Sequence, residues 1–117
     1  MASPSDLSDP TFRDAMQRIE KLLDDGDYTD ACRASGETYL ALLNKRPELI
    51  PGASTGPHTP VGMSRAIAWP PNGGLRVNVE DGKPSLAYAK ERFSMSEAYG
   101  YYEFMMNLLW GLQNQKL

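Results

Sequence analysis

The segment at residues 98–112, AYGYYEFMMNLLWGL, constrains the fold most because it is apolar around an unusually large part of a helix. At 100° per residue its apolar side chains cover an arc of about 200°, whereas a surface helix needs an apolar stripe roughly 100° wide. Glu103 and Asn107 mark the polar side. We expect one half of the arc to face the core of the domain and the other half to face a second partner.

The length and composition are those of one soluble domain. The chain has 117 residues, of which 41% are hydrophobic and 23% are charged, and its net charge of -3 supplies no positive field to attract nucleic acid. Residues 1–44 hold nine acidic and four basic residues, whereas residues 76–117 hold five of each. We therefore expect a single domain over residues 1–117 that does not bind nucleic acid, with an acidic face in its first third.

The sequence also bears on the cellular compartment. One cysteine cannot form an internal disulfide, and the first residues lack the basic stretch and apolar core of a secretory signal. The apolar run 98–112 is shorter than the roughly 20 residues that cross a bilayer. An in-plane membrane helix carries Lys or Arg along its polar face, and this helix has none before Lys116. These observations predict a cytoplasmic protein without membrane contact.

Residues 9–46 have the pattern of two antiparallel helices. Asp9, followed by proline, is a typical helix start, the next apolar residues recur every three or four positions, and Gly26 supplies a left-handed stop. Asp27 is expected to cap a second helix that ends before Pro47. Because the connection between the two helices is very short, they are predicted to pack as a helical hairpin.

Part of this hairpin resembles a known repeat. The segment at residues 26–31, followed by Tyr39, Leu42 and Pro47, is similar to the second half of a tetratricopeptide repeat unit, in which a Gly-x-Tyr-x-x-Ala turn joins two helices. The second helix is about one turn longer than in such a repeat, and no second copy follows, whereas stacked arrays need roughly three units. For residues 9–47 the resemblance implies a helical hairpin of the kind used in protein contacts, and it transfers no binding residues.

Two segments lack a regular pattern. Residues 1–8 show no apolar periodicity and are predicted to fray. Residues 47–74 hold six of the nine prolines and five of the ten glycines, so we expect a loop there, with a short strand at residues 66–69 as its one regular element.

A β-hairpin is predicted over residues 75–92. Residues 75–79 alternate apolar and polar side chains, the Asp-Gly pair at 81–82 is a strong turn signal, and residues 85–92 supply the return strand. The alternative is a helix over residues 86–92, since Ala, Lys and Glu favour helix there.

The last element is a helix over residues 94–114, whose start is marked by Ser94 and Glu97 at capping-box spacing. The order helix, helix, loop, hairpin, helix predicts an α+β domain in which helices cover one face of a small antiparallel sheet of two or three strands. Such a sheet is marginal alone, so it needs the helices, and a neighbouring molecule, to close both faces.

No catalytic residue, metal site or cofactor is predicted. Cys32 lies in the apolar stripe of the second helix, where a thiol is usually a small, inert core residue. With one histidine and one cysteine, only carboxylates remain as metal ligands. The acidic cluster at residues 24–30 lacks the glycine and glutamate spacing of a calcium loop.

The aromatic and methionine residues of the last helix predict a protein-binding face, because tyrosine and tryptophan offer a large apolar area with one polar tip. Tyr99, Glu103, Met106 and Trp110 are expected at the outer margin of the helix, as apolar anchors around one polar contact. The leading hypothesis is a non-enzymatic interaction or assembly protein. It would bind another protein or a second copy of itself, as a homodimer or as an accessory or inhibitory subunit.

The alternative hypothesis is a small-ligand-binding or enzymatic domain whose pocket lies under the loop at residues 47–74. His58 and Trp69 would line that pocket, and His58 would serve as its acid–base group. Its weakness is a shortage of other acid–base groups, and a loop histidine is usually exposed without a role.

Overall fold

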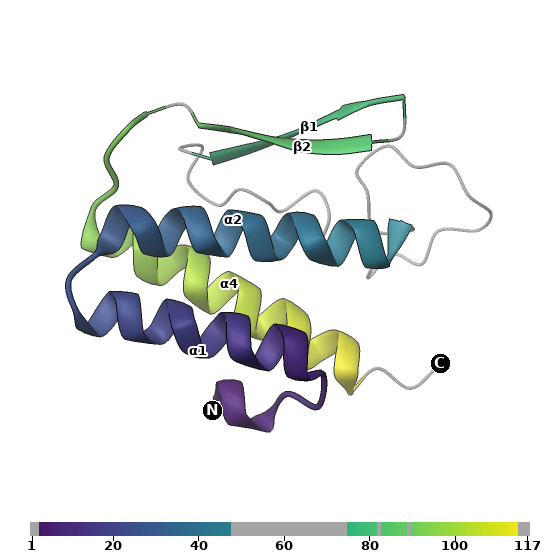
Figure 1. Cartoon of the computed structure of the whole chain (residues 1–117), viewed down its shortest axis with the longest axis horizontal. Helices are drawn as coiled ribbons and strands as arrows, with labels where there is room; N and C mark the ends of the chain where they lie inside the picture. Colours follow the sequence, from purple (N-terminus) through teal and green to yellow (C-terminus); the bar gives the residue numbers. More distant parts are fainter. Residues whose placement is uncertain (1–2, 48–74, 82, 89, 115–117) are drawn as a thin grey trace.

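The computed structural model describes residues 3–47, 75–81, 83–88 and 90–114, which form three long helices and a two-stranded sheet (Figure 1). In chain order the elements are η1 (Pro4–Asp6), α1 (Pro10–Asp24), α2 (Tyr28–Lys45), β1 (Leu75–Glu80), β2 (Lys83–Tyr88) and α4 (Met95–Gln113). The predicted α+β class is confirmed. Helix α2 forms the middle layer, with the sheet on one side and α1 and α4 on the other (Figure 1).

Helices α1 and α2 form the predicted antiparallel hairpin (Figure 1). The Asp9 carboxylate caps α1 by accepting a hydrogen bond from the Thr11 backbone nitrogen at 2.9 Å. Gly26 turns the chain with a φ of 79°, a conformation that glycine adopts at little cost. Asp27 occupies the N-cap position of α2 as predicted, but its side chain accepts no capping hydrogen bond.

The prediction that the first eight residues fray is wrong for those that the structure describes. Leu7 is 3% exposed and packs into the core behind η1. The Gln113 side chain accepts hydrogen bonds from the Ser8 backbone nitrogen at 2.7 Å and the Ser8 hydroxyl at 3.0 Å, and it donates one to the Asp6 carbonyl at 2.9 Å. A single leucine has no periodicity, so the sequence pattern gave no sign of this anchor.

Strands β1 and β2 pair in antiparallel register, with Leu75 opposite Tyr88. Asp81 stands in the turn with a φ of 52°, as the predicted Asp-Gly turn requires. The helical alternative for residues 86–92 is wrong, although the return strand runs from Lys83 to Tyr88 and not over the predicted residues 85–92. Leu86 packs against the helical core, and this burial outweighs the helix propensity of its neighbours.

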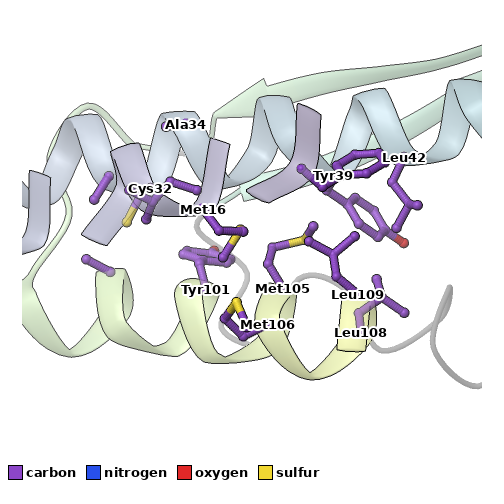
Figure 2. Packing of buried hydrophobic residues seen from close by; sticks show 14 of the residues in the cluster. Met16, Cys32, Ala34, Tyr39, Leu42, Tyr101, Met105, Met106, Leu108 and Leu109 are labelled. Carbon is purple, nitrogen blue, oxygen red and sulfur yellow. The ribbon is translucent and has the colours of Figure 1, made fainter. Parts of the chain in front are cut away.

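The core lies between the three long helices and below the sheet (Figure 2). Its largest fully buried side chains come from each of these elements: Met16 and Ile19 of α1, Tyr39 and Leu43 of α2, Leu75 of β1, and Tyr101 and Met105 of α4. The core thus joins the N-terminal hairpin, the sheet and the C-terminal helix into one unit.

Helix α2 is buried around more of its circumference than the predicted stripe. Ala34 and Thr38, which border α1, and Gly36, which faces the sheet, are also buried. A Cβ atom on Gly36 would lie 2.8 Å from a methyl group of Leu75, so glycine permits the sheet to approach closely. The Thr38 hydroxyl donates to the Ala34 carbonyl at 2.7 Å, which satisfies its polar atom inside the helix.

Candidate functional site

The start of α4 is fixed by the predicted capping box. The Ser94 hydroxyl accepts a hydrogen bond from the Glu97 backbone nitrogen at 3.2 Å, and the Glu97 carboxylate accepts one from the Ser94 backbone nitrogen at 3.0 Å. Lys90 pairs with the same carboxylate at 2.5 Å. The hydrogen bond from Lys90, with those from Ser94, holds the pKa of Glu97 below its ordinary value of 4.5.

The core side of α4 is wide. Six residues of the helix are buried: Ala98, Tyr101, Met105, Met106, Leu108 and Leu109. With the half-buried Phe104 and Tyr102, the sheltered arc spans about 200° at 100° per residue. The Tyr101 hydroxyl accepts a hydrogen bond from the Leu75 backbone nitrogen at 3.0 Å, which ties α4 to β1. Most of the apolar arc expected from the sequence is therefore used inside the protein.

One edge of α4 lies against α1. The Tyr102 hydroxyl donates a hydrogen bond to the Glu20 carboxylate at 2.9 Å. Burial is the main cause that raises the pKa of Tyr102, and the hydrogen bond and charge of Glu20 and the charge of Asp24 raise it further. Glu20 and Asp24 of α1 therefore lie close to this edge of α4.

The prediction that Met106 lies at the outer margin of α4 is wrong, because its side chain is 4% exposed. At 100° per residue Met106 falls between Tyr99 and Tyr102, whose hydroxyl contacts Glu20 of α1. Figure 2 shows Met106 among the packed core residues. The sequence pattern indicates the direction of the Met106 side chain but not whether other elements bury it.

The other three predicted residues, Tyr99, Glu103 and Trp110, do lie on the outside of α4. Tyr99 is 40% exposed, Trp110 is 38% exposed, and Glu103 between them is exposed as well. Met95, one helical turn before Tyr99, is 54% exposed and lies on the same side. We call Met95, Tyr99, Glu103 and Trp110 the α4 flank.

Sequence reasoning missed Met95 because it stands beside the capping residue, at the edge of the apolar run. Its spacing of four residues from Tyr99 is the signal that would have found it. Glu20 and Asp24 were assigned to the acidic first third of the chain, and only the folded structure shows that they border α4.

Two small grooves lie away from the α4 flank. One, of about 250 Å³, has an apolar floor that includes Phe12, Leu42 and Leu109, and the ion pair of Asp9 and Lys45 stands at its rim. The other, of about 180 Å³, runs between α1 and α2. Both are smaller than the roughly 300–1,000 Å³ typical of small-molecule sites.

The other residues singled out by the sequence are Cys32, His58 and Trp69. Cys32 is a core residue as predicted, and burial raises the pKa of its thiol to about 12, so the thiol stays protonated at neutral pH. His58 and Trp69, the strand predicted at residues 66–69 and nearly all of the loop at residues 47–74 lie outside the described residues. The described part of the chain holds no group of three potential metal-ligating side chains and no helix that could span a membrane.

Similarity to known proteins indicates no function for this chain. No protein-family model, characterised protein or solved structure matches this chain. The resemblance of residues 9–47 to a tetratricopeptide unit stays a prediction, and the hairpin itself is what the structure shows.

Proposed function

We propose that this chain is a non-enzymatic interaction protein that binds another protein through the α4 flank. One observation carries the proposal. Of the four large hydrophobic side chains that the described residues expose, three lie on this flank: Met95, Tyr99 and Trp110. The fourth, Tyr88, lies on β2. Exposed apolar residues scattered singly need no explanation, whereas a row of them on one helix is typical of a contact surface.

The residue types of the α4 flank also favour protein binding. Tyrosine, tryptophan and methionine are enriched in the cores of protein interfaces, and burying their apolar area contributes roughly 25 cal/mol per Å². Trp110 and Tyr99 are held on a helix whose opposite side is locked into the core by Tyr101 and Met105. A partner would therefore meet anchors that are already positioned, which lowers the entropy lost on binding.

The chemistry of the flank supports binding over catalysis. Glu103 is its one carboxylate, and the α4 flank as defined contains no histidine, cysteine or lysine to act with it. General acid–base or nucleophilic catalysis needs such a second group within hydrogen-bond reach.

The test is a double substitution, Tyr99→Ala with Trp110→Ala. We expect this variant to keep the circular dichroism spectrum and the cooperative melting of the wild type, because both side chains are partly exposed. It should lose the association of the wild type, measured as mass in solution over a concentration series and as proteins retained from a lysate of the native cells. Met106 is left intact because it belongs to the core.

Tyr88→Ala is the matched control, because Tyr88 is as exposed as Tyr99 but lies on β2. The control should associate like the wild type. If the folded double variant has the same mass and retains the same proteins as the wild type, the proposed function is wrong.

A further inference from the structure

We infer that the partner presents a basic amphipathic helix to the α4 flank and is not a second copy of this chain. This inference rests on the proposed function and adds the chemistry of the partner. Its basis is the distribution of charge around the exposed apolar row.

Three carboxylates surround the half of the α4 flank that contains Tyr99. Glu103 belongs to the flank itself, and Glu20 of α1 touches Tyr102 next to it. The Glu20–Tyr102 contact and the contact of Ser8 with Gln113 fix an antiparallel alignment of the N-terminal segment and α4. This alignment places Asp24, four residues after Glu20, beside the first turns of α4.

These carboxylates lack cationic partners within the part of the chain that the structure describes. Glu103 and Asp24 form no ion pair there, and Lys21, three residues before Asp24, forms none with it. Lys90, at the start of α4, is already paired with Glu97. The apolar row therefore carries an uncompensated negative border, which lysine or arginine of a partner would complement.

The negative charge is concentrated at the end of the α4 flank that contains Tyr99. The antiparallel alignment that sets Glu20 beside Tyr102 places Arg13, two helical turns earlier in α1, near Trp110. The cations of the partner are therefore expected opposite Tyr99, while Trp110 is left for an apolar contact.

The same charges disfavour a second copy of this chain. In a two-fold dimer the same patch occurs on both sides of the contact, so the residue nearest the axis meets its own copy. Glu103 is the exposed residue nearest the middle of the row from Met95 to Trp110. Pairing of two flanks would bring two Glu103 carboxylates together, and it would add repulsion from Glu20 and Asp24.

A helix is the shape that fits this surface. The anchors Met95, Tyr99 and Trp110 follow one side of α4 over about four turns. An amphipathic partner helix would place apolar residues at steps of three and four along this row, with lysine or arginine at its margins.

The experiment is a selection from a displayed library of helical peptides of about four turns. Apolar positions vary among Leu, Met, Phe and Trp, and marginal positions vary among Lys, Gln and Glu. The full-length protein is the bait, at low salt because surface charges are screened at high salt. We expect Lys to exceed Glu at the margins of selected peptides by about tenfold, as several weak ion pairs together would give.

A charge-neutral bait, Glu103→Gln with Asp24→Asn, should remove the preference for Lys while it still selects the same apolar residues. The bait Trp110→Ala should lose the selection as a whole, and Tyr88→Ala should behave like the wild type.

The outcomes separate this inference from the proposed function. Equal selection of Lys and Glu, still dependent on Trp110, overturns the basic partner and leaves the proposed function standing. A dimer of the wild-type chain that is lost in the Tyr99→Ala, Trp110→Ala variant would likewise overturn the basic partner and leave the proposed function standing. A selection that Trp110→Ala does not change, or one that enriches no peptide, contradicts the proposed function and with it this inference.

Discussion

Helices α2 and α4 have nearly the same length, 18 and 19 residues, yet their burial does not follow their hydrophobicity. The sequence of α4 is the more apolar, but Tyr99 and Trp110 remain partly exposed. The sequence of α2 is mixed, but nine of its residues are buried, including Ser35 and Thr38. The difference lies in the neighbours, because α1, α4 and both strands pack on α2, whereas α4 packs mainly on α1 and α2.

The comparison shows that the burial of a helix depends on how many neighbouring elements pack on it. Gly36 of α2 lets the sheet approach closely, so α2 is covered by the sheet as well as by α1 and α4. On α4, the large side chains of Tyr99 and Trp110 remain partly exposed. A wide apolar arc in a sequence therefore does not measure how much of the helix the rest of the domain covers.

The largest expected effect separates the two sides of α4. Tyr101→Ala should lower the free energy of unfolding by about 3–5 kcal/mol, because it removes a fully buried ring from the core. Tyr99→Ala should lower it by less than about 1 kcal/mol, since that ring is partly exposed. Urea denaturation of both variants measures the difference.

Equal losses of unfolding free energy in these two variants would show that Tyr99 belongs to the core, and the distinction between the two sides of α4 would be wrong. Tyr101→Phe sharpens the result, because it removes only the oxygen that accepts the Leu75 backbone N–H. Leaving that buried donor unsatisfied should cost about 1–3 kcal/mol.

The next effect tests the close approach of the sheet to α2. Gly36→Val should lower the free energy of unfolding by about 1–3 kcal/mol, because its side chain would overlap Leu75, which is buried and cannot move into solvent. Thermal melting would report the loss. Gly100→Val on α4 is the matched control, since nothing lies within 4 Å of a Cβ atom there. Equal effects at the two glycines would mean that helix propensity alone is responsible.

A smaller effect is expected at the start of α4. Ser94→Ala should lower the free energy of unfolding by about 1 kcal/mol, because it removes the acceptor for the Glu97 backbone nitrogen. Hydrogen exchange should show faster opening of the first turn of α4, with little change in α2. A loss spread evenly over both helices would argue against a local cap.

The smallest expected effect is a pH dependence of stability. The folded protein lowers the pKa of Glu97 through Lys90 and that of Asp9 through Lys45. Their stabilisation is therefore present above the ordinary values of 4.5 and 3.8 and is lost as the pH falls below them. The melting temperature should decline on acidification through this range, and Glu97→Gln should flatten the decline. A melting temperature that rises on acidification would contradict this assignment.

Local signals in the sequence predicted much of the fold. Asp9, Gly26 and Ser94 mark helix ends through backbone geometry and capping hydrogen bonds, so their neighbours in sequence are sufficient to interpret them. The β-hairpin likewise follows from its turn residues and the alternation of its side chains, although its second strand starts two residues before the predicted position.

Features that depend on distant contacts were not predicted. Leu7 lies beside Leu109 and Leu112, far along the chain, and Met106 is buried in the core cluster, which the spacing of residues within one segment does not reveal. The spacing of residues within α4 is sufficient to place Tyr99 and Trp110 on its outside. The acidic border supplied by Glu20 depends on how α1 packs against α4, so the sequence does not predict it.

The Gln113 side chain connects the two ends of the described chain, because one amide group holds both Ser8 and Asp6. Opening of the last turn of α4 removes the partners of this N-terminal segment, and release of the segment frees the last turn in the same way. The two ends should therefore open together as one cooperative unit, and their backbone amides should exchange with deuterium at matching rates. A partner that binds Trp110 would slow that shared opening at both ends of the described chain.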